Sequence, residues 1–323
     1  MKKYIFFLLI LQLFYGCSVN GDSDPVNLDI EIESNEDKNS QITQSIPPND
    51  VAEMKSLFES FDGISTSSDS NYFYISSNGL PSHNMMVGIT NWQQQFPIDQ
   101  NYTGDNSWSI PINAEFSDKP LSSEENFMKG ALAIAVNGIP IFNPLNNRGE
   151  DASAIGELDQ WGGHCGKADD YHYHLPPIHL SDVVGNNSPI AYSLDGFPVY
   201  GKTDKLLDEN LGILNEDGSY QYYSIDDYPY FIANMKGKIT TSGIAPENQI
   251  DPQSVTSAIR PALNPLKDAV ITNFTKIDSN SYQLKYEINS EIFIIDYYWD
   301  SSGHYYITFT NPDGTKQIET YHR

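Results

Sequence analysis

Histidines gather in one short segment of this chain. Residues 161–179 hold four of the seven histidines, together with Cys165, one of only two cysteines. His172 and His174 are two residues apart, so in an extended strand both imidazoles project from one face, with their Cα atoms about 6–7 Å apart. Imidazoles at this spacing can converge on one ion, and three such ligands suit zinc or copper with a coordination position left open. The segment therefore predicts a metal site.

Three histidines of this segment form the expected ligand set: His164, His172 and His174. Cys165 could replace one of them, because a thiolate is a strong soft ligand for copper or zinc. Since adjacent side chains of an extended segment point apart, His164 and Cys165 are not expected to bind together. The alternative for Cys165 is a small apolar side chain in the core.

Two residues outside the segment are further candidates for chemistry. His83 ends the sequence Ser-Asn-Gly-Leu-Pro-Ser-His at residues 77–83 and is a candidate fourth ligand or acid/base. The alternative is a histidine on an exposed loop. Asp195 is a candidate catalytic residue, because a carboxylate beside a metal site can orient an imidazole N–H group. An Asp followed by Gly is equally typical of a turn.

The strand that carries the histidines must be held in place by its neighbours. If residues 171–174 are extended, Tyr171 and Tyr173 occupy the face opposite the histidines and can pack there. Pro176 and Pro177 end this strand, because proline cannot donate to a strand ladder.

The rest of the chain has the pattern of a mainly β protein with minor α+β character. Short apolar runs broken by Gly, Pro and Asn begin at residue 72 and are typical of strands and turns. Helical spacing predicts one short helix after Asp50, over residues 51–61, and short helices are also expected at 123–129 and 152–158. We assign residues 51–262 to one domain and predict a separate C-terminal β-meander module at 266–323.

The main domain contains an internal duplication. Residues 133–142 align with 191–200 at an offset of 58, and the similarity continues downstream at an offset of 49. Each copy reads as strand, Asn/Asp-Gly turn and strand, so two copies at about 131–180 and 189–230 should pack as pseudo-symmetric halves. The histidines are the exception, since their counterparts are Ile213, Gln221 and Tyr223. The scaffold is repeated and the ligand set is not, which favours one functional site per chain. The alternative is simple drift of the second copy.

These residues resemble the YHYH domain family of secreted bacterial and eukaryotic proteins, named for the tetrapeptide at residues 171–174. Four other stretches carry the resemblance, at residues 77–83, 136–144, 162–164 and 194–201, so that it spans about 72–240. The resemblance implies a domain type and no particular reaction. Relatives often carry a second Gly-His and a second Tyr-His-Tyr-His in the later half. This chain departs from them there, so a mechanism with two equivalent histidine sites is not expected.

The first residues resemble a bacterial lipoprotein leader. Lys2 and Lys3 precede an apolar run, and a glycine stands directly before Cys17. We predict a signal peptide at residues 1–16, lipidation of Cys17, and a polar tether at 17–50. The protein would then be extracytoplasmic and anchored to the bacterial cell envelope by lipid, with the outer membrane favoured. The alternative is an ordinary signal peptide with an incidental cysteine.

Charge and motifs limit the function classes. A formal net charge of −25 makes nucleic acid an unsuitable partner, so we expect a small-molecule or metal ligand. The chain lacks the Gly-x-Ser-x-Gly, phosphate-loop, His-Glu-x-x-His and dinucleotide motifs. The leading hypothesis is a lipid-anchored YHYH domain with one histidine-based zinc or copper site, either enzymatic or not. Its rivals are a non-catalytic metal- or ligand-binding envelope protein, and an interaction module whose histidines are hydrogen-bonded structural elements.

Overall fold

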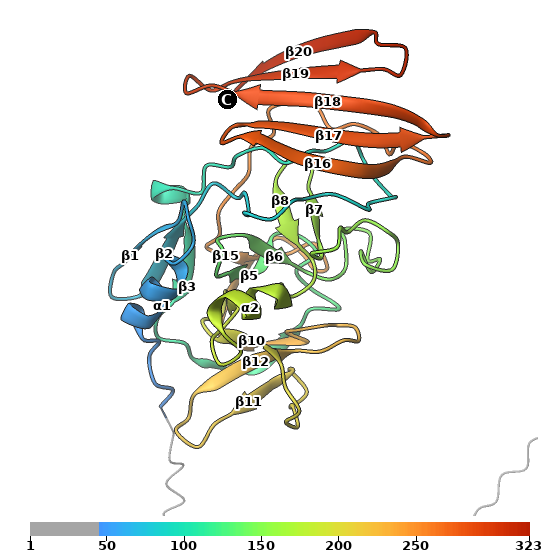
Figure 1. Cartoon of the computed structure of the whole chain (residues 1–323). Coiled ribbons are helices and arrows are strands. Elements are labelled where there is room, and N and C mark those ends of the chain that lie inside the picture. Colours follow the sequence, from blue (N-terminus) through green and yellow to red (C-terminus); the bar gives the residue numbers. More distant parts are fainter. Residues whose placement is uncertain (1–44) are drawn as a thin grey trace, which may run out of the picture. The chain divides into compact units, whose positions relative to one another are not determined.

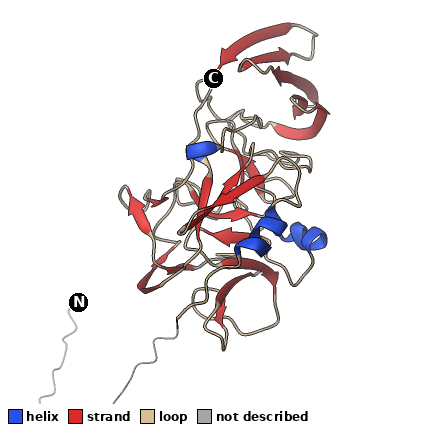
Figure 2. Ribbon diagram, turned by 90° about the vertical axis from the view of Figure 1, so that its left-hand side faces the viewer, coloured by secondary structure: helices blue, strands red, loops and turns tan. Residues whose placement is uncertain are grey.

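The computed structural model describes residues 45–323, and these residues are mainly β. The predicted leader at 1–16, the predicted lipidation site Cys17 and most of the predicted tether at 17–50 lie outside the described residues. Five sheets account for most of the secondary structure in this part of the chain, and helices are few and short (Figures 1 and 2). The predicted fold class is confirmed. Between residues 45 and 323, no helix combines the length and apolarity needed to cross a membrane.

An eight-stranded sheet forms the centre of the domain. From edge to edge its strands are β11 (Gly212–Leu214), β12 (Tyr220–Ser224), β10 (Pro198–Lys202), β9 (Ala191–Ser193), β5 (Ala131–Ala135), β6 (Pro140–Phe142), β8 (Tyr171–Tyr173) and β7 (Gly163–Cys165). Strands β5, β9 and β8 are completely buried, and their side chains supply much of the core.

The predicted duplication is visible as a pseudo-two-fold axis in this sheet. Strands β5 and β9 pair antiparallel at its centre, with Ile134 opposite Tyr192, its own counterpart at the offset of 58. Outside this pair, β6 pairs parallel with β8 through Ile141 and Tyr173, and β10 pairs parallel with β12 through Val199 and Tyr222. The edge hairpins β7–β8 and β11–β12 also share one register. The two copies are therefore the two halves of one continuous sheet.

Smaller elements surround the sheet. A three-stranded sheet contains β1 (Ser65–Ser68), β2 (Tyr72–Ser76) and β3 (Trp108–Pro111). There are also two two-stranded sheets. One pairs β4 (Phe116–Ser122) with β13 (Asn234–Gly237), and the other pairs β14 (Thr240–Ser242) with β15 (Gln249–Asp251). Helix α1 spans Val51–Phe58 and is capped by the Asp50 side chain, as predicted, although it ends before residue 61. Helix α2 is a single turn at Ser181–Val184, and 3-10 turns lie at Gly104–Asn106 and Ile178–Leu180.

The predicted helices at 123–129 and 152–158 are wrong, because both segments form turns. In the first segment, the Phe127 N–H donates to Asn248 and the residue has a positive φ of 64°. In the second, the Asp151 carboxylate accepts two backbone N–H groups, and Gly156 has a positive φ of 75°. Seven-residue helices are marginal without tertiary support, so these competing hydrogen bonds decide the local conformation.

The C-terminal strands form an antiparallel five-stranded meander in sequence order. Its members are β16 (Val270–Asp278), β17 (Ser281–Ile288), β18 (Glu291–Trp299), β19 (His304–Thr310) and β20 (Lys316–His322). The Tyr297 hydroxyl donates to the Pro97 carbonyl at 2.7 Å, and the Gly88 N–H donates to the Ile271 carbonyl at 2.8 Å. Residues 45–323 accordingly belong to one compact unit. Whether 266–323 can fold as a separate domain stays a prediction.

Candidate metal centre

The hairpin β7–β8 places two of the predicted ligands side by side. His164 and His172 are opposite each other across the two strands, so their side chains share one face of the sheet. Gly163 is required beside them, because a Cβ atom there would lie 2.4 Å from the Tyr171 hydroxyl. The Phe142 ring of β6 stacks on the His172 imidazole with the ring centroids 4.0 Å apart, and this contact fixes the ring plane.

The third predicted ligand, His174, completes a compact cluster of Nε2 atoms. His174 Nε2 lies 3.0 Å from His164 Nε2 and 3.2 Å from His172 Nε2, and one nitrogen of each residue lies within 4.8 Å of the others. Three nitrogens on one tetrahedral zinc or copper ion, at bonds of about 2.0–2.1 Å, would be separated by about 3.3–3.4 Å. The two separations from His174, 3.0 and 3.2 Å, are close to this spacing, and the third nitrogen pair lies within 4.8 Å, so a small adjustment of the rings would let them share an ion.

The other ring nitrogens fix the tautomers of two ligands. His172 Nδ1 lies 3.0 Å from the Asp170 carbonyl oxygen, and His174 Nδ1 makes a short contact with the Asn143 carbonyl oxygen. A carbonyl oxygen can only accept, so each Nδ1 carries the proton and each Nε2 of the neutral ring presents a lone pair. Two lone pairs therefore face each other at 3.2 Å. A cation between them is the natural compensation.

Protonation is a poor substitute for that cation. Burial, with a smaller contribution from the neighbouring His172, lowers the pKa of His174 to about 3. Burial also lowers the pKa of His164, and the neighbouring imidazoles and Arg148 act in the same direction. Because His174 is only 4% exposed, water cannot solvate an extra proton on its ring. The cluster is therefore built for neutral imidazoles, the form that binds a metal.

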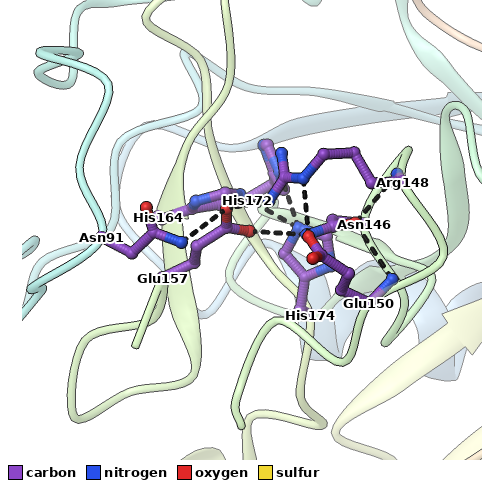
Figure 3. Close-up of polar contacts among 8 residues, drawn as sticks. All are labelled: Asn91, Asn146, Arg148, Glu150, Glu157, His164, His172 and His174. Carbon is purple, nitrogen blue, oxygen red and sulfur yellow. Dashed lines mark hydrogen bonds and ion pairs between the residues drawn. The ribbon is translucent and has the colours of Figure 1, made fainter. Parts of the chain in front are cut away.

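A polar group lies beside the cluster (Figure 3). The buried Glu157 carboxylate makes an ion pair with Arg148 at 2.5 Å and accepts hydrogen bonds from Asn146 at 3.1 Å and Asn91 at 3.4 Å. Glu157 and the partly exposed His164 line one small pocket. Its volume of about 20 Å³ is enough for roughly one ordered water molecule.

Glu157 and Arg148 were not predicted as site residues. The comparison of the two copies contains a signal for Glu157, since its counterpart at the offset of 49 is Leu206, whose side chain is 95% exposed. Glu157 thus differs between the copies in the same way as the three histidines. No comparable signal points to Arg148, which comes from the loop after β6 and reaches Glu157 only through the tertiary fold.

His83 lies on the other face of the hairpin. Its Nε2 lies 2.7 Å from the Tyr173 hydroxyl, its Nδ1 lies 2.7 Å from the Asn84 carbonyl oxygen, and its ring stacks on Trp161. The tyrosines were expected on the face opposite the ligands, so His83 packs behind the strand that carries them. Both of its ring nitrogens are occupied, and the structure does not bring it to the three-histidine cluster.

The remaining candidates are not members of the three-histidine cluster, although Cys165 lines the same small pocket as His164. Cys165 pairs with Tyr171 across the hairpin and is 2% exposed, and burial raises the pKa of its thiol, which disfavours the ligating thiolate. Asp195 belongs to the second copy, where it accepts hydrogen bonds from the Tyr222 hydroxyl at 2.7 Å and from the Gly237 N–H at 2.8 Å. These contacts are those of a buried structural carboxylate.

Comparison with known proteins supports the family assignment. Residues 107–315 match the family described as YHYH protein, and the match includes both copies and the whole histidine hairpin. Searches of curated proteins and of solved structures found no match. The matched region covers most of the chain, and we conclude that this protein belongs to the YHYH family.

Proposed function

We propose that this YHYH domain binds one transition-metal ion, zinc or copper, through the Nε2 atoms of His164, His172 and His174. One observation carries the proposal: His172 and His174 both commit Nδ1–H to backbone carbonyls and point unprotonated Nε2 atoms at each other across 3.2 Å. If the histidines were purely structural, His164 could donate one Nε2–H bond to His174. The lone pairs of His172 Nε2 and His174 Nε2 would still face each other, with neither a proton nor a cation between them.

We further propose that the site has the layout of a catalytic centre. Three histidines leave one position of a tetrahedral ion for water or substrate, whereas structural sites use four protein ligands. Bound zinc would make a water molecule more acidic, and bound copper would support redox chemistry. Glu157 lines the same pocket as His164 and is the candidate acceptor for a proton released there. Arg148 and Asn146 hold its carboxylate in place.

The main rival is a non-catalytic metal-binding protein, and the size of the pocket favours it. A volume of about 20 Å³ admits water and excludes a substrate of ordinary size. A variant separates the two functions. Glu157→Gln should retain the ion and lose activity in a catalytic centre, whereas in a storage or structural site it should change neither metal content nor any measured reaction.

The decisive experiment measures metal content by inductively coupled plasma mass spectrometry after separate loading with zinc and with copper. The parent protein should hold close to one ion per chain, and the double variant His172→Ala/His174→Ala should hold almost none. The matched control is Gln221→Ala, because Gln221 occupies the position of His172 in the second copy. A parent protein that retains neither metal under these conditions would exclude the proposal.

The cellular location is a separate proposal and depends on sequence alone. We propose that Cys17 is lipidated after removal of residues 1–16, so that the protein is anchored at the bacterial cell envelope. Labelling with a fatty-acid analogue should mark the full-length protein, and Cys17→Ser should abolish the label and release the protein from the membrane fraction. Equal labelling of both proteins would contradict lipidation at this residue.

A further inference from the structure

A second site lies at one end of the C-terminal meander, apart from the histidine cluster. Four strand ends meet there, because the β16–β17 and β18–β19 turns lie at the same end of an antiparallel sheet. Arg323, the last residue described, also lies at the tip of β18 (Figure 1). Residues 99–101 also line this site, which is an open cleft with a volume of about 590 Å³. Ligand pockets for small molecules have about this size.

The floor of the cleft is built from three residues that are far apart in the chain. The Tyr305 hydroxyl donates to Asp99 Oδ1 at 2.9 Å, Arg323 Nη1 donates to the Asp99 carbonyl at 2.7 Å, and the guanidinium lies 5.4 Å from the Tyr305 ring centroid. These contacts fix a carboxylate, a guanidinium and an aromatic ring relative to one another. The group is rigid before any ligand arrives, which reduces the entropy lost on binding.

Some of the hydrogen-bonding capacity in this group is unused. Arg323 Nε is buried and has no hydrogen-bond partner among residues 45–323. The hydrogen bond from Tyr305 uses Oδ1 of Asp99 and leaves Oδ2 free of any hydrogen bond within the described part of the chain. Burial raises the pKa of Asp99, as expected for a carboxylate that has lost water without gaining a full set of donors. The partly buried Asp99 carboxylate therefore keeps an acceptor position for a ligand, whereas Arg323 Nε is covered by the surrounding protein.

The remaining lining combines both kinds of polar group with an aromatic surface. Asn101 lies at the rim, where its Oδ1 accepts a hydrogen bond from the Thr103 hydroxyl and its Nδ2 is a further donor, and Asp300 adds a second carboxylate. Trp299 also lines the cleft, with its ring centroid 6.0 Å from that of Tyr305. Two carboxylates against one guanidinium disfavour phosphate and other anions. Neighbouring donors and acceptors beside ring faces complement a molecule with adjacent hydroxyl groups and an apolar C–H face.

We propose that this cleft binds a neutral saccharide of one or two rings, with Asp99 and Arg323 bonding adjacent hydroxyls and Trp299 contacting the ring face. The proposal does not depend on the metal site. A site built to hydrogen-bond hydroxyls discriminates strongly against ligands that lack them, so selectivity for sugars over apolar molecules follows.

The test is titration of the purified protein with neutral mono- and disaccharides (glucose, galactose, mannose, N-acetylglucosamine, lactose and cellobiose). Tryptophan fluorescence and saturation-transfer NMR are suitable readouts. At least one sugar should bind, with a Kd of about 1 mM, as is usual for a small polar ligand. Asp99→Asn, which keeps the shape of the side chain, should weaken binding at least tenfold. Asn101→Ala, at an exposed rim position, should weaken it several-fold without affecting folding.

The matched control is Tyr298→Ala, because Tyr298 precedes Trp299 on β18, points to the other face of the sheet and is 48% exposed. This variant should bind the sugar within twofold of the parent protein, and so should His172→Ala. If none of these sugars binds at concentrations up to 50 mM, the proposal is overturned. A preference for phosphate or sulfate, or an equal loss of affinity in Tyr298→Ala, would overturn it as well.

Discussion

The two halves of the central sheet share one scaffold and differ in chemistry. In the first copy, Asp159 accepts hydrogen bonds from the Tyr171 hydroxyl at 2.8 Å and the Gly163 N–H at 3.2 Å. In the second, Asp208 accepts the equivalent bonds from Tyr220 and Gly212, both at 2.9 Å. The hairpin registers are also equivalent. These shared contacts define what the fold requires.

The difference between the copies that bears on chemistry lies on one face of the hairpin. Where the first copy has three histidines, the second has Ile213, Gln221 and Tyr223, and Gln221 bonds directly to the Tyr223 hydroxyl. The second copy thus pairs Gln221 with Tyr223 at the positions of His172 and His174, whereas the first copy leaves lone pairs facing each other there. The second copy shows that the fold does not need these histidines. Their facing lone pairs also lack a cation between them, and both facts together indicate a ligand site.

The largest effect should come from removing the ion from the first copy. Metal bound only by the folded state stabilises it by about 4 kcal/mol at a free concentration 1,000-fold above Kd, which is about 8–16 °C in Tm for a domain of this size. Chelation should therefore lower the Tm of the parent protein and of Gln221→Ala, and should leave His172→Ala unchanged. A chelator that shifts His172→Ala equally would place the ion elsewhere.

The next largest effect should separate the two scaffold carboxylates. Asp159 is 7% exposed and also accepts the Met86 N–H at 2.8 Å, whereas Asp208 is exposed. Asp159→Ala leaves several buried donors unpaired and should cost about 3–5 kcal/mol in unfolding free energy, against about 1 kcal/mol for Asp208→Ala. Urea denaturation measures both. Equal losses of unfolding free energy in the two variants would contradict the expectation that the buried carboxylate contributes more than the exposed one.

A smaller effect is expected from pH at the back of the first hairpin. Burial lowers the pKa of His83 to about 4, so the folded state binds fewer protons there than the unfolded state, whose histidines titrate near 6.5. The neutral His83 ring therefore contributes to the unfolding free energy above about pH 6.5, and this contribution is lost as the pH falls towards 4. The loss should be about 2 kcal/mol, because the ring is partly exposed. The difference in unfolding free energy between parent and His83→Gln should follow this profile. A difference independent of pH would contradict it.

The smallest effect, a gain of function, should come from grafting the ligands onto the second copy. Ile213→His/Gln221→His/Tyr223→His places imidazoles at the equivalent register positions. Metal content should rise from about one ion to about two, with the added ion held more weakly because Leu206 stands in place of Glu157. An unchanged content of one ion would mean that the register alone does not build the site.

Several features could be predicted from the residues because they depend on local spacing. The β pattern, the duplication and the convergence of His172 with His174 each follow from a period of two in strands and from turn residues. The failed helices at 123–129 and 152–158 mark the limit of this approach. There, Asn248 and Gly156 compete with helix formation, and in the first segment the competitor lies more than 100 residues away.

The sequence by itself determined the strand–turn–strand unit of each copy and the identity of the histidines, since both follow from neighbours in the chain. Only the tertiary structure decided that Glu157 meets Arg148 beside the cluster, that His83 lies behind it, and that Asp99 meets Arg323 in a second cleft. These groups come from loops and strand ends whose approach depends on the packing of whole sheets. Local periodicity carries no information on that packing, because pairs separated by many residues are chosen by the burial of the entire core.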